Sequence, residues 1–243
     1  MLGVGSVSAT DAKDNTAHYR VRNIQHIIHY ILPIFDSYPL LTSKYFYYDL
    51  FKKAILIIND SSLSNQEKDE KIDYLKAQCL PVNYISPAWN NVNNQVTSIV
   101  DAMTVMTKSW LIGFTEAEGS FYIVKKGPFR LVHAFEITLA RASLDKIVLE
   151  AIALILSLEV TTKKTYITVV TTNSKAIEYI ISYYFKTMKG MKALEYRIWA
   201  RSFTKKGSTG FEYMTKIKNL MRNIRSIRLD KNFNKKEGEA HIY

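Results

Sequence analysis

The sequence predicts an α+β fold in which antiparallel sheets are covered by helices on one face. The first observation is that short segments of alternating apolar and polar residues occur in pairs, as half-buried antiparallel strands do. The second is that longer segments with apolar residues at helical spacing separate these pairs. From about residue 109 the order is helix, two strands, helix, two strands, helix, helix. Such an order requires helices that cover a sheet.

Each element of this order has its own local pattern. Residues 120–124 alternate around Phe121 and Ile123, and a polar turn at 161–164 precedes a run of β-branched residues. Asn173 or Ser174 supplies a cap for the helix that follows. The predicted strands are 120–124, 131–139 and 166–170, and the predicted helices are 144–156, 174–185, a stretch that begins at Lys192, and 211–224.

The first third of the chain repeats the latter part of this order. Strands are predicted at 4–9 and 18–21, separated by a turn at 11–15, and helices at 24–35 and 45–58. Prolines and asparagines mark a loop-rich segment between the two repeats. We therefore predict a truncated first repeat at 1–79, a linker at 80–108, a complete second repeat at 109–228 and a polar tail at 229–243.

The most informative segment is residues 110–121, WLIGFTEAEGSF. Glu116 and Glu118 stand at the end of a predicted helix, where the negative end of the helix dipole disfavours carboxylates and favours a cation such as a metal ion. Gly113 and Ala117 share one face of this helix, so another backbone can approach closely. Gly119 is expected to end the helix in the left-handed conformation. The alternative is a core helix with a glycine cap and two solvated glutamates.

Residues 111–119 resemble, position by position, the LAGLIDADG motif of homing endonucleases and intron maturases. Tyr38-Pro39-Leu40 before Lys44 also resembles the segment that ends the first repeat of that family. The resemblance implies a LAGLIDADG endonuclease fold and hydrolysis of double-stranded DNA with Mg²⁺. It assigns Glu118 as the catalytic carboxylate and metal ligand, and Lys44 and Lys192 as basic residues that stabilise the scissile phosphate. Glu116 is interpreted as structural or solvated, and either lysine is alternatively ordinary surface charge.

In the family, two motif helices pack together and each delivers one acidic residue to a shared site. Glu118 lies 74 positions before Lys192, and the same spacing counted back from Lys44 falls before Met1. The resemblance therefore predicts that the first motif helix is missing from this sequence. Cleavage would then need the missing half, supplied by a partner chain or by a second copy that associates through the face formed by Gly113 and Ala117.

The resemblance also implies that the sheet binds DNA in the major groove. If Phe121, Phe135 and Ile137 face the helices, alternate positions face the DNA. The predicted DNA-binding residues are Ser120, Tyr122, Val124, Glu136 and Thr138 on this face and Lys125, Lys126 and Arg130 in the hairpin. Further basic residues would add affinity for phosphates without reading sequence; these are Lys205, Lys206, Arg222, Arg225 and Arg228.

The composition is compatible with this function. The net charge is +11, which favours a polyanionic partner. The single cysteine, Cys79, excludes an internal disulfide framework, and the five histidines show no zinc-binding spacing. No membrane span or signal peptide is predicted. The abundance of Ile, Lys, Asn and Tyr suits an AT-rich genome. The resemblance implies an intron-encoded, organellar protein, and we expect it to be mitochondrial.

Two functions of other classes remain open from sequence. One is an RNA-binding maturase that assists the splicing of a group I intron, because a basic surface serves DNA and RNA equally well. The other is a non-catalytic remnant.

Overall fold

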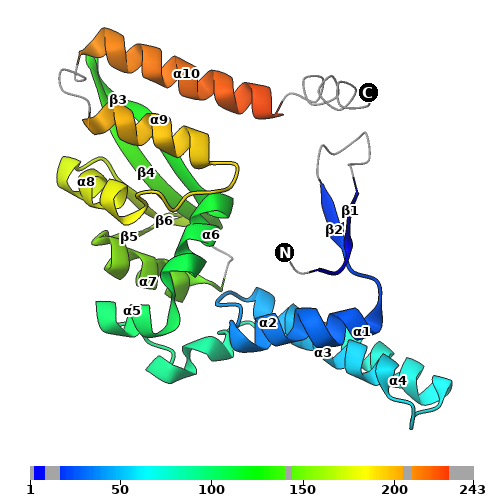
Figure 1. Cartoon of the computed structure of the whole chain (residues 1–243). Coiled ribbons are helices and arrows are strands. Elements are labelled where there is room, and N and C mark those ends of the chain that lie inside the picture. The colour runs from blue at the N-terminus through cyan, green and yellow to red at the C-terminus, as the bar shows by residue number, and fades with distance from the viewer. Residues whose placement is uncertain (1–2, 9–16, 141–143, 205–209, 230–243) are drawn as a thin grey trace, which may run out of the picture. The chain divides into compact units, whose positions relative to one another are not determined.

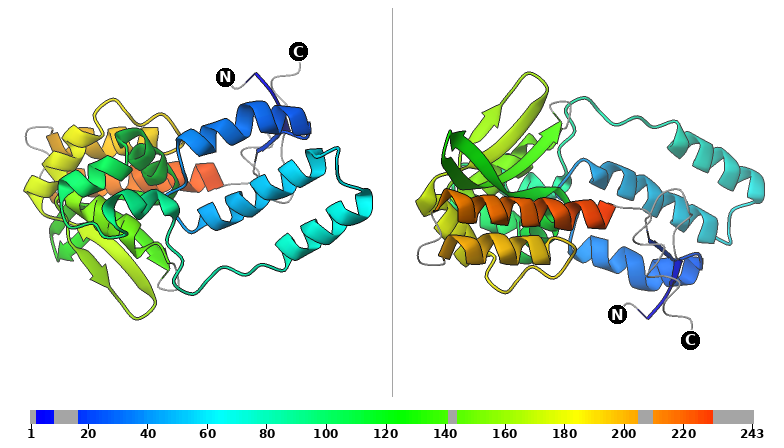
Figure 2. Two further views of the ribbon diagram at one scale, coloured as in Figure 1. Left: turned by 90° about the horizontal axis from the view of Figure 1, so that it is seen from below. Right: turned by 90° about the horizontal axis from the view of Figure 1, so that it is seen from above.

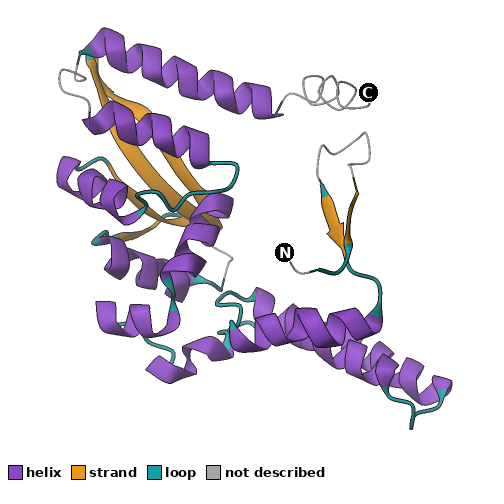
Figure 3. Ribbon diagram, viewed as in Figure 1, coloured by secondary structure: helices purple, strands orange, loops and turns teal. Residues whose placement is uncertain are grey.

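The computed structural model describes residues 3–8, 17–140, 144–204 and 210–229, except for the side chains of Arg228 and Leu229. The chain divides into an N-terminal unit, Met1–Asn94, and a C-terminal unit, Gln95–Tyr243. Both units combine helices with antiparallel strands (Figures 1 and 3), which confirms the predicted α+β class. The predicted turn at 11–15, Lys205, Lys206 and the tail from residue 230 lie outside the described residues.

The C-terminal unit contains the complete αββαββα repeat that the sequence predicts. Its sheet has four antiparallel strands in the order β3-β4-β6-β5, so β3 is an edge strand and β4 lies inside the sheet. The elements of this unit are α5 (Ile99–Val105), α6 (Lys108–Glu118), β3 (Gly119–Gly127), β4 (Arg130–Ala140), α7 (Lys146–Leu156), β5 (Val160–Thr162), β6 (Tyr166–Thr171), α8 (Ser174–Tyr183), α9 (Ala193–Thr204) and α10 (Phe211–Leu229).

Helices cover one face of this sheet because one set of alternate residues is apolar. Phe121 and Ile123 on β3 are buried, whereas their neighbours on the strand are partly exposed. Helices α6, α9 and α10 contact β3, and α7 and α8 contact the other strands. Figure 2 shows α9 and α10 side by side along the sheet.

The core of the C-terminal unit is built around the ring of Phe121. This side chain is 1 % exposed, and its ring centroid lies 5.3 Å from that of Phe135, 5.2 Å from that of Tyr196 and 5.1 Å from that of Trp199. Burial of a phenylalanine contributes about 1.5–3 kcal/mol, and each favourable ring pair adds about 0.5–1.5 kcal/mol. The cluster therefore fixes the edge strand β3 against α9.

The N-terminal unit has the same order of elements as the second half of the repeat, strand, strand, helix, helix. Its core cluster includes Ile27, Leu32, Tyr48 and Ile55. The Tyr48 hydroxyl donates to the carbonyl of Leu32 at 3.1 Å. The elements are β1 (Ser6–Ser8), β2 (His18–Arg20), α1 (Ile24–His26), the π-helix η1 (Ile27–Ile31), α2 (Leu32–Ser37), α3 (Lys44–Asn59), α4 (Asn65–Lys76) and the 3₁₀ helix η2 (Pro87–Val92).

The segment predicted to be a loop-rich linker, residues 80–108, contains the short helices η2 and α5. The division between the two units falls inside it, after Asn94. Its first part packs on the N-terminal unit, because the Ser86 hydroxyl and the Trp89 ring N–H donate to the carbonyls of Leu40 and Leu41 at 2.6 and 2.8 Å.

Candidate active site and nucleic-acid interface

The helix of the acidic motif, α6, is held on one side and open on the other. The Thr107 hydroxyl caps its first turn by accepting from the Trp110 amide at 3.2 Å. The buried Thr115 hydroxyl hydrogen-bonds with the Tyr184 hydroxyl at 2.7 Å. On the opposite face Gly113 and Ala117 are exposed, and a Cβ added at Gly113 would meet no atom within 4 Å. This face therefore leaves room for a second backbone, as the sequence predicts.

The predicted left-handed cap at Gly119 is wrong. Gly119 has φ −73° and ψ 156°, so the chain passes directly from α6 into the extended β3. A glycine is needed for a different reason, which is space. A Cβ at this position would lie 2.6 Å from Thr115 Cγ2 and 2.8 Å from the Thr115 carbonyl oxygen. The absence of a side chain allows the strand to start against the last turn of the helix.

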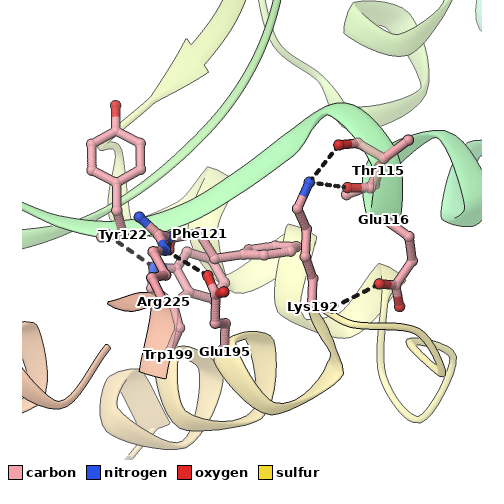
Figure 4. Close-up of polar contacts among 9 residues, drawn as sticks. Thr115, Glu116, Phe121, Tyr122, Lys192, Glu195, Trp199 and Arg225 are labelled. Carbon is pink, nitrogen blue, oxygen red and sulfur yellow. Dashed lines mark hydrogen bonds and ion pairs between the residues drawn. The ribbon is translucent and has the colours of Figure 1, made fainter. Parts of the chain in front are cut away.

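Glu116 is a structural residue, as interpreted from the sequence. Its carboxylate accepts three backbone hydrogen bonds from the turn before α9, from the amides of Lys189 at 3.1 Å, Gly190 at 2.8 Å and Lys192 at 3.0 Å. Figure 4 shows this carboxylate beside Lys192. Hydrogen bonds to an ionised acceptor are stronger than neutral ones. Glu116 thus fixes the position of the turn that carries Lys192.

Lys192 meets the end of the motif helix. Its ammonium group donates to the carbonyl of Ala117 at 2.8 Å. It also donates to the carbonyl of Thr115 at 3.4 Å (Figure 4). A cation at the C-terminal end of a helix interacts favourably with the helix dipole. The position of two carboxylates at the end of this helix predicts a cation here, for example a metal ion. In the structure the Lys192 ammonium occupies this place, at the carbonyl of Ala117, the residue before Glu118.

Glu118 is the last residue of α6, and its side chain is exposed. Ser120, two positions later, lies on the predicted DNA-binding face of β3. Among the described residues no group of three or more His, Cys, Asp or Glu side chains is placed to hold a metal ion. Mg²⁺ binds through one or two carboxylates together with waters and substrate phosphates. Glu118 therefore suits one ligand of such a site.

The other lysine predicted to be catalytic, Lys44, belongs to the N-terminal unit. It is the first residue of α3, and its ammonium lies 5.9 Å from the centroid of the Tyr47 ring. Its approach to the site at Glu118 stays a prediction.

The predicted DNA-binding face of the sheet is polar and partly exposed. Ser120, Tyr122 and Val124 alternate with buried residues on β3, and Glu136 and Thr138 are partly exposed on β4. The Tyr122 hydroxyl donates to Glu136 Oε2 at 2.7 Å. Burial, and then this hydrogen bond, raises the pKa of Tyr122 well above its ordinary value. In Figure 4 the Tyr122 ring points away from Trp199 and Glu195 of α9.

The hairpin between β3 and β4 carries the predicted phosphate contacts. Lys125, Lys126 and Arg130 are exposed, and the strand register shifts between Lys125 and Gly127. Lys125 also lines a groove of about 240 Å³ between β3 and α10, together with Lys218 and Arg222. Lys218 was not among the predicted residues, although it lies four residues before Arg222 on one helical face.

Arg225 was predicted to contact phosphates, and the structure shows that it also has a structural role. Its Nε donates to Glu195 Oε2 at 2.7 Å and its Nη2 donates to the Phe121 carbonyl at 2.6 Å (Figure 4). The Trp199 ring N–H donates to the Tyr122 carbonyl at 3.2 Å. These bonds join α9 and α10 to the edge strand β3. The side chain of Arg228 lies outside the described residues.

The comparison with protein families agrees with this geometry. Residues 1–55 and 111–203 match the LAGLIDADG endonuclease family. This chain is a member of the LAGLIDADG endonuclease family. The matched residues lie in both units and include most of the motif helix, the four-stranded sheet and Lys192.

Individual LAGLIDADG proteins resemble the chain over most of its length. It is 36 % identical over 234 residues to the probable intron-encoded endonuclease Cox1-I1b of Schizosaccharomyces pombe; the match covers 93 % of this chain and 56 % of that protein. The chain thus spans little more than half of this relative. The I-SmaMI LAGLIDADG homing endonuclease bound to cleaved DNA has a TM-score of 0.69 at 23 % identity, with 94 % of this chain and 79 % of that chain covered.

A second structure of I-SmaMI, bound to an uncleaved DNA target in the presence of calcium ions, has a TM-score of 0.67 at 23 % identity. It covers 93 % of this chain and 79 % of that chain. These likenesses confirm the predicted LAGLIDADG fold. Within the described part of the chain, no helix has the length and apolar character needed to cross a membrane.

Proposed function

We propose that this chain is an intron-encoded homing endonuclease polypeptide that binds a long double-stranded DNA target and hydrolyses phosphodiester bonds with Mg²⁺. The observation that carries the proposal is the end of α6. There the exposed Glu118 is the last residue of the helix, and the Lys192 ammonium donates to the carbonyl of Ala117, the residue before it. The relative from Schizosaccharomyces pombe is named as an intron-encoded endonuclease, and I-SmaMI is bound to DNA. The Cox1 name supports a mitochondrial origin for this chain.

The residues of the C-terminal unit have different roles in such a reaction. Glu118 supplies a carboxylate oxygen to Mg²⁺, in agreement with the preference of that ion for oxygen ligands. When bound, the ion supplies Lewis-acid stabilisation of charge on the phosphate oxygens. Lys192 stabilises the negative charge that develops on the attacked phosphate, because a fixed ammonium acts electrostatically at this place. Lys44 is proposed for the same role from the N-terminal unit.

The sheet face and the hairpin provide binding. Ser120, Tyr122, Val124, Glu136 and Thr138 face the base edges in the major groove, which a two-stranded β-ribbon can enter. Lys125, Lys126 and Arg130 bind phosphates and set the register on the duplex. The open face of α6 at Gly113 and Ala117 receives a second motif helix, from the same protein or from a partner chain. That helix delivers the second carboxylate of the site.

The test is cleavage of a plasmid that carries the intronless junction of the host gene. We expect nicked or linear DNA with Mg²⁺, none with EDTA, and loss of cleavage but retained DNA binding for Glu118→Gln. Retained DNA binding without hydrolysis by the wild-type chain, alone and mixed with a second motif-bearing fragment, would contradict the catalytic part of the proposal. Tighter binding to the host intron RNA than to DNA at matched salt would favour the maturase function instead.

A further inference from the structure

The open face of the C-terminal sheet carries one carboxylate, Glu136, that is fixed by hydroxyl groups from three strands. The Tyr122 hydroxyl on β3 donates to its Oε2 at 2.7 Å. The Thr138 hydroxyl on β4 lies 2.7 Å from its Oε1 and 2.7 Å from the Thr168 hydroxyl on β6. Thr168 is 3 % exposed. The carboxylate therefore has a single defined position in the middle of the sheet.

If this face only bound phosphates, a carboxylate here would be unfavourable. DNA is a polyanion, and a negative side chain on the face that approaches it opposes binding. None of the ion pairs found within the described ranges includes Glu136. Its hydroxyl partners are neutral, so they orient the charge without cancelling it. A gain in specificity for the DNA sequence is the natural compensation for this repulsion.

Glu136 retains the capacity to accept another hydrogen bond. Each carboxylate oxygen has about two acceptor positions, and Oε2 uses one of them for Tyr122. The cross-strand neighbours of Glu136 are Ser120 on β3 and Val170 on β6. Both are shorter than a glutamate, and Val170 is 41 % exposed. Glu136 is itself partly exposed, so a group that approaches from the solvent side reaches it between these neighbours.

We propose that Glu136 is a specificity-determining residue that accepts a hydrogen bond from the exocyclic amine of a cytosine in the major groove. The inference rests on the proposed function of the chain in binding DNA. An ionised carboxylate only accepts hydrogen bonds. Guanine presents two acceptors in the major groove, thymine an acceptor and a methyl group, and adenine an acceptor beside its amine. Cytosine presents only its amine, so it is the base that a fixed carboxylate prefers.

The experiment is selection of DNA from a randomised duplex library by the full chain and its variants. For the wild type we expect an enriched motif with cytosine at one position. Glu136→Gln should change that position to adenine, because an amide pairs with the donor and acceptor of adenine, and should leave the other positions unchanged. The expected discrimination is about tenfold per base, as for other well-placed contacts. Tyr122→Phe should keep cytosine but weaken the preference, because Oε2 loses its fixed position.

The matched control is Glu178→Gln, which removes an equal charge from an exposed position on α8 and should leave the motif unchanged. Identical motifs and discrimination for the wild type, Glu136→Gln and Tyr122→Phe would overturn the inference while leaving the proposed DNA binding intact. Failure of the wild type to enrich any sequence would instead overturn the proposed function. Tyr122→Phe removes one hydroxyl without changing shape, so it tests the idea even if Glu136→Gln folds poorly.

Discussion

Replacement of Glu116 by alanine tests how the motif helix positions Lys192. The carboxylate accepts from the amides of Lys189, Gly190 and Lys192 at 3.1, 2.8 and 3.0 Å. A hydrogen bond to a charged group contributes about 1.5–3 kcal/mol. Lys189 and Gly190 are exposed, so water replaces part of what is lost. We expect Glu116→Ala to lower the free energy of unfolding by about 3 kcal/mol, and Glu116→Gln by about half as much, because one oxygen remains.

Hydrogen exchange measured by mass spectrometry shows the local effect most directly, since these amides lose their acceptor. We expect the amides of Lys189, Gly190 and Lys192 to exchange about 100-fold faster in Glu116→Ala, which corresponds to about 3 kcal/mol of local protection. Urea unfolding followed by tryptophan fluorescence reports the global effect. Glu178→Ala is the control, with a change within about 0.5 kcal/mol. Unchanged exchange of these amides in Glu116→Ala would refute the reasoning.

Three further predictions concern the packing that supports the site. Burial lowers the pKa of His133 to about 4, below about 6.5 in the unfolded chain, so stability is full above pH 6.5 and falls as pH drops toward 4. Between pH 7.5 and 5 the free energy of unfolding, measured with urea, should fall by about 2 kcal/mol. The same fall in His133→Gln would contradict this cause. Gly119→Ala should destabilise by about 1–3 kcal/mol, because its Cβ meets the Thr115 backbone; an unchanged thermal midpoint would exclude the clash. Arg225→Met should lower the free energy of unfolding in urea by about 2–3 kcal/mol, because Glu195 is 2 % exposed and loses this cation. The addition of Glu195→Gln should restore part of the lost stability. A double variant no more stable than Arg225→Met would argue against the ion pair.

The sequence predicted the parts of the fold that depend on local pattern. Alternation placed Phe121 inside and Tyr122 outside correctly, because each strand has one buried face. Helices α4 and α5 were missed, although each begins with a capping box, formed by Ser64 with Glu67 and by Ser98 with Asp101. Helix α4 is mostly polar, with Ile72 and Leu75 as its only partly buried apolar residues, so it has little of the apolar periodicity on which the prediction relied.

Contacts between distant segments were not predictable in the same way. The dipole argument required a cation at the end of α6, but nothing local identifies Lys192, which reaches Ala117 from 75 positions away. Gly119 was assigned the wrong conformation because glycines usually end helices in the left-handed region, and the space required by Thr115 is visible only in three dimensions. Thr168 joins Glu136 only through the register of β4 with β6.

The most direct test of the central claim is the cleavage rate of target DNA by Glu118→Gln compared with wild type at saturating Mg²⁺, measured together with DNA affinity. If Glu118 supplies the metal ligand for hydrolysis, the variant keeps its affinity within about threefold and loses at least about 100-fold in rate. A variant that cleaves at the wild-type rate would contradict the assignment of this carboxylate and the account built on it.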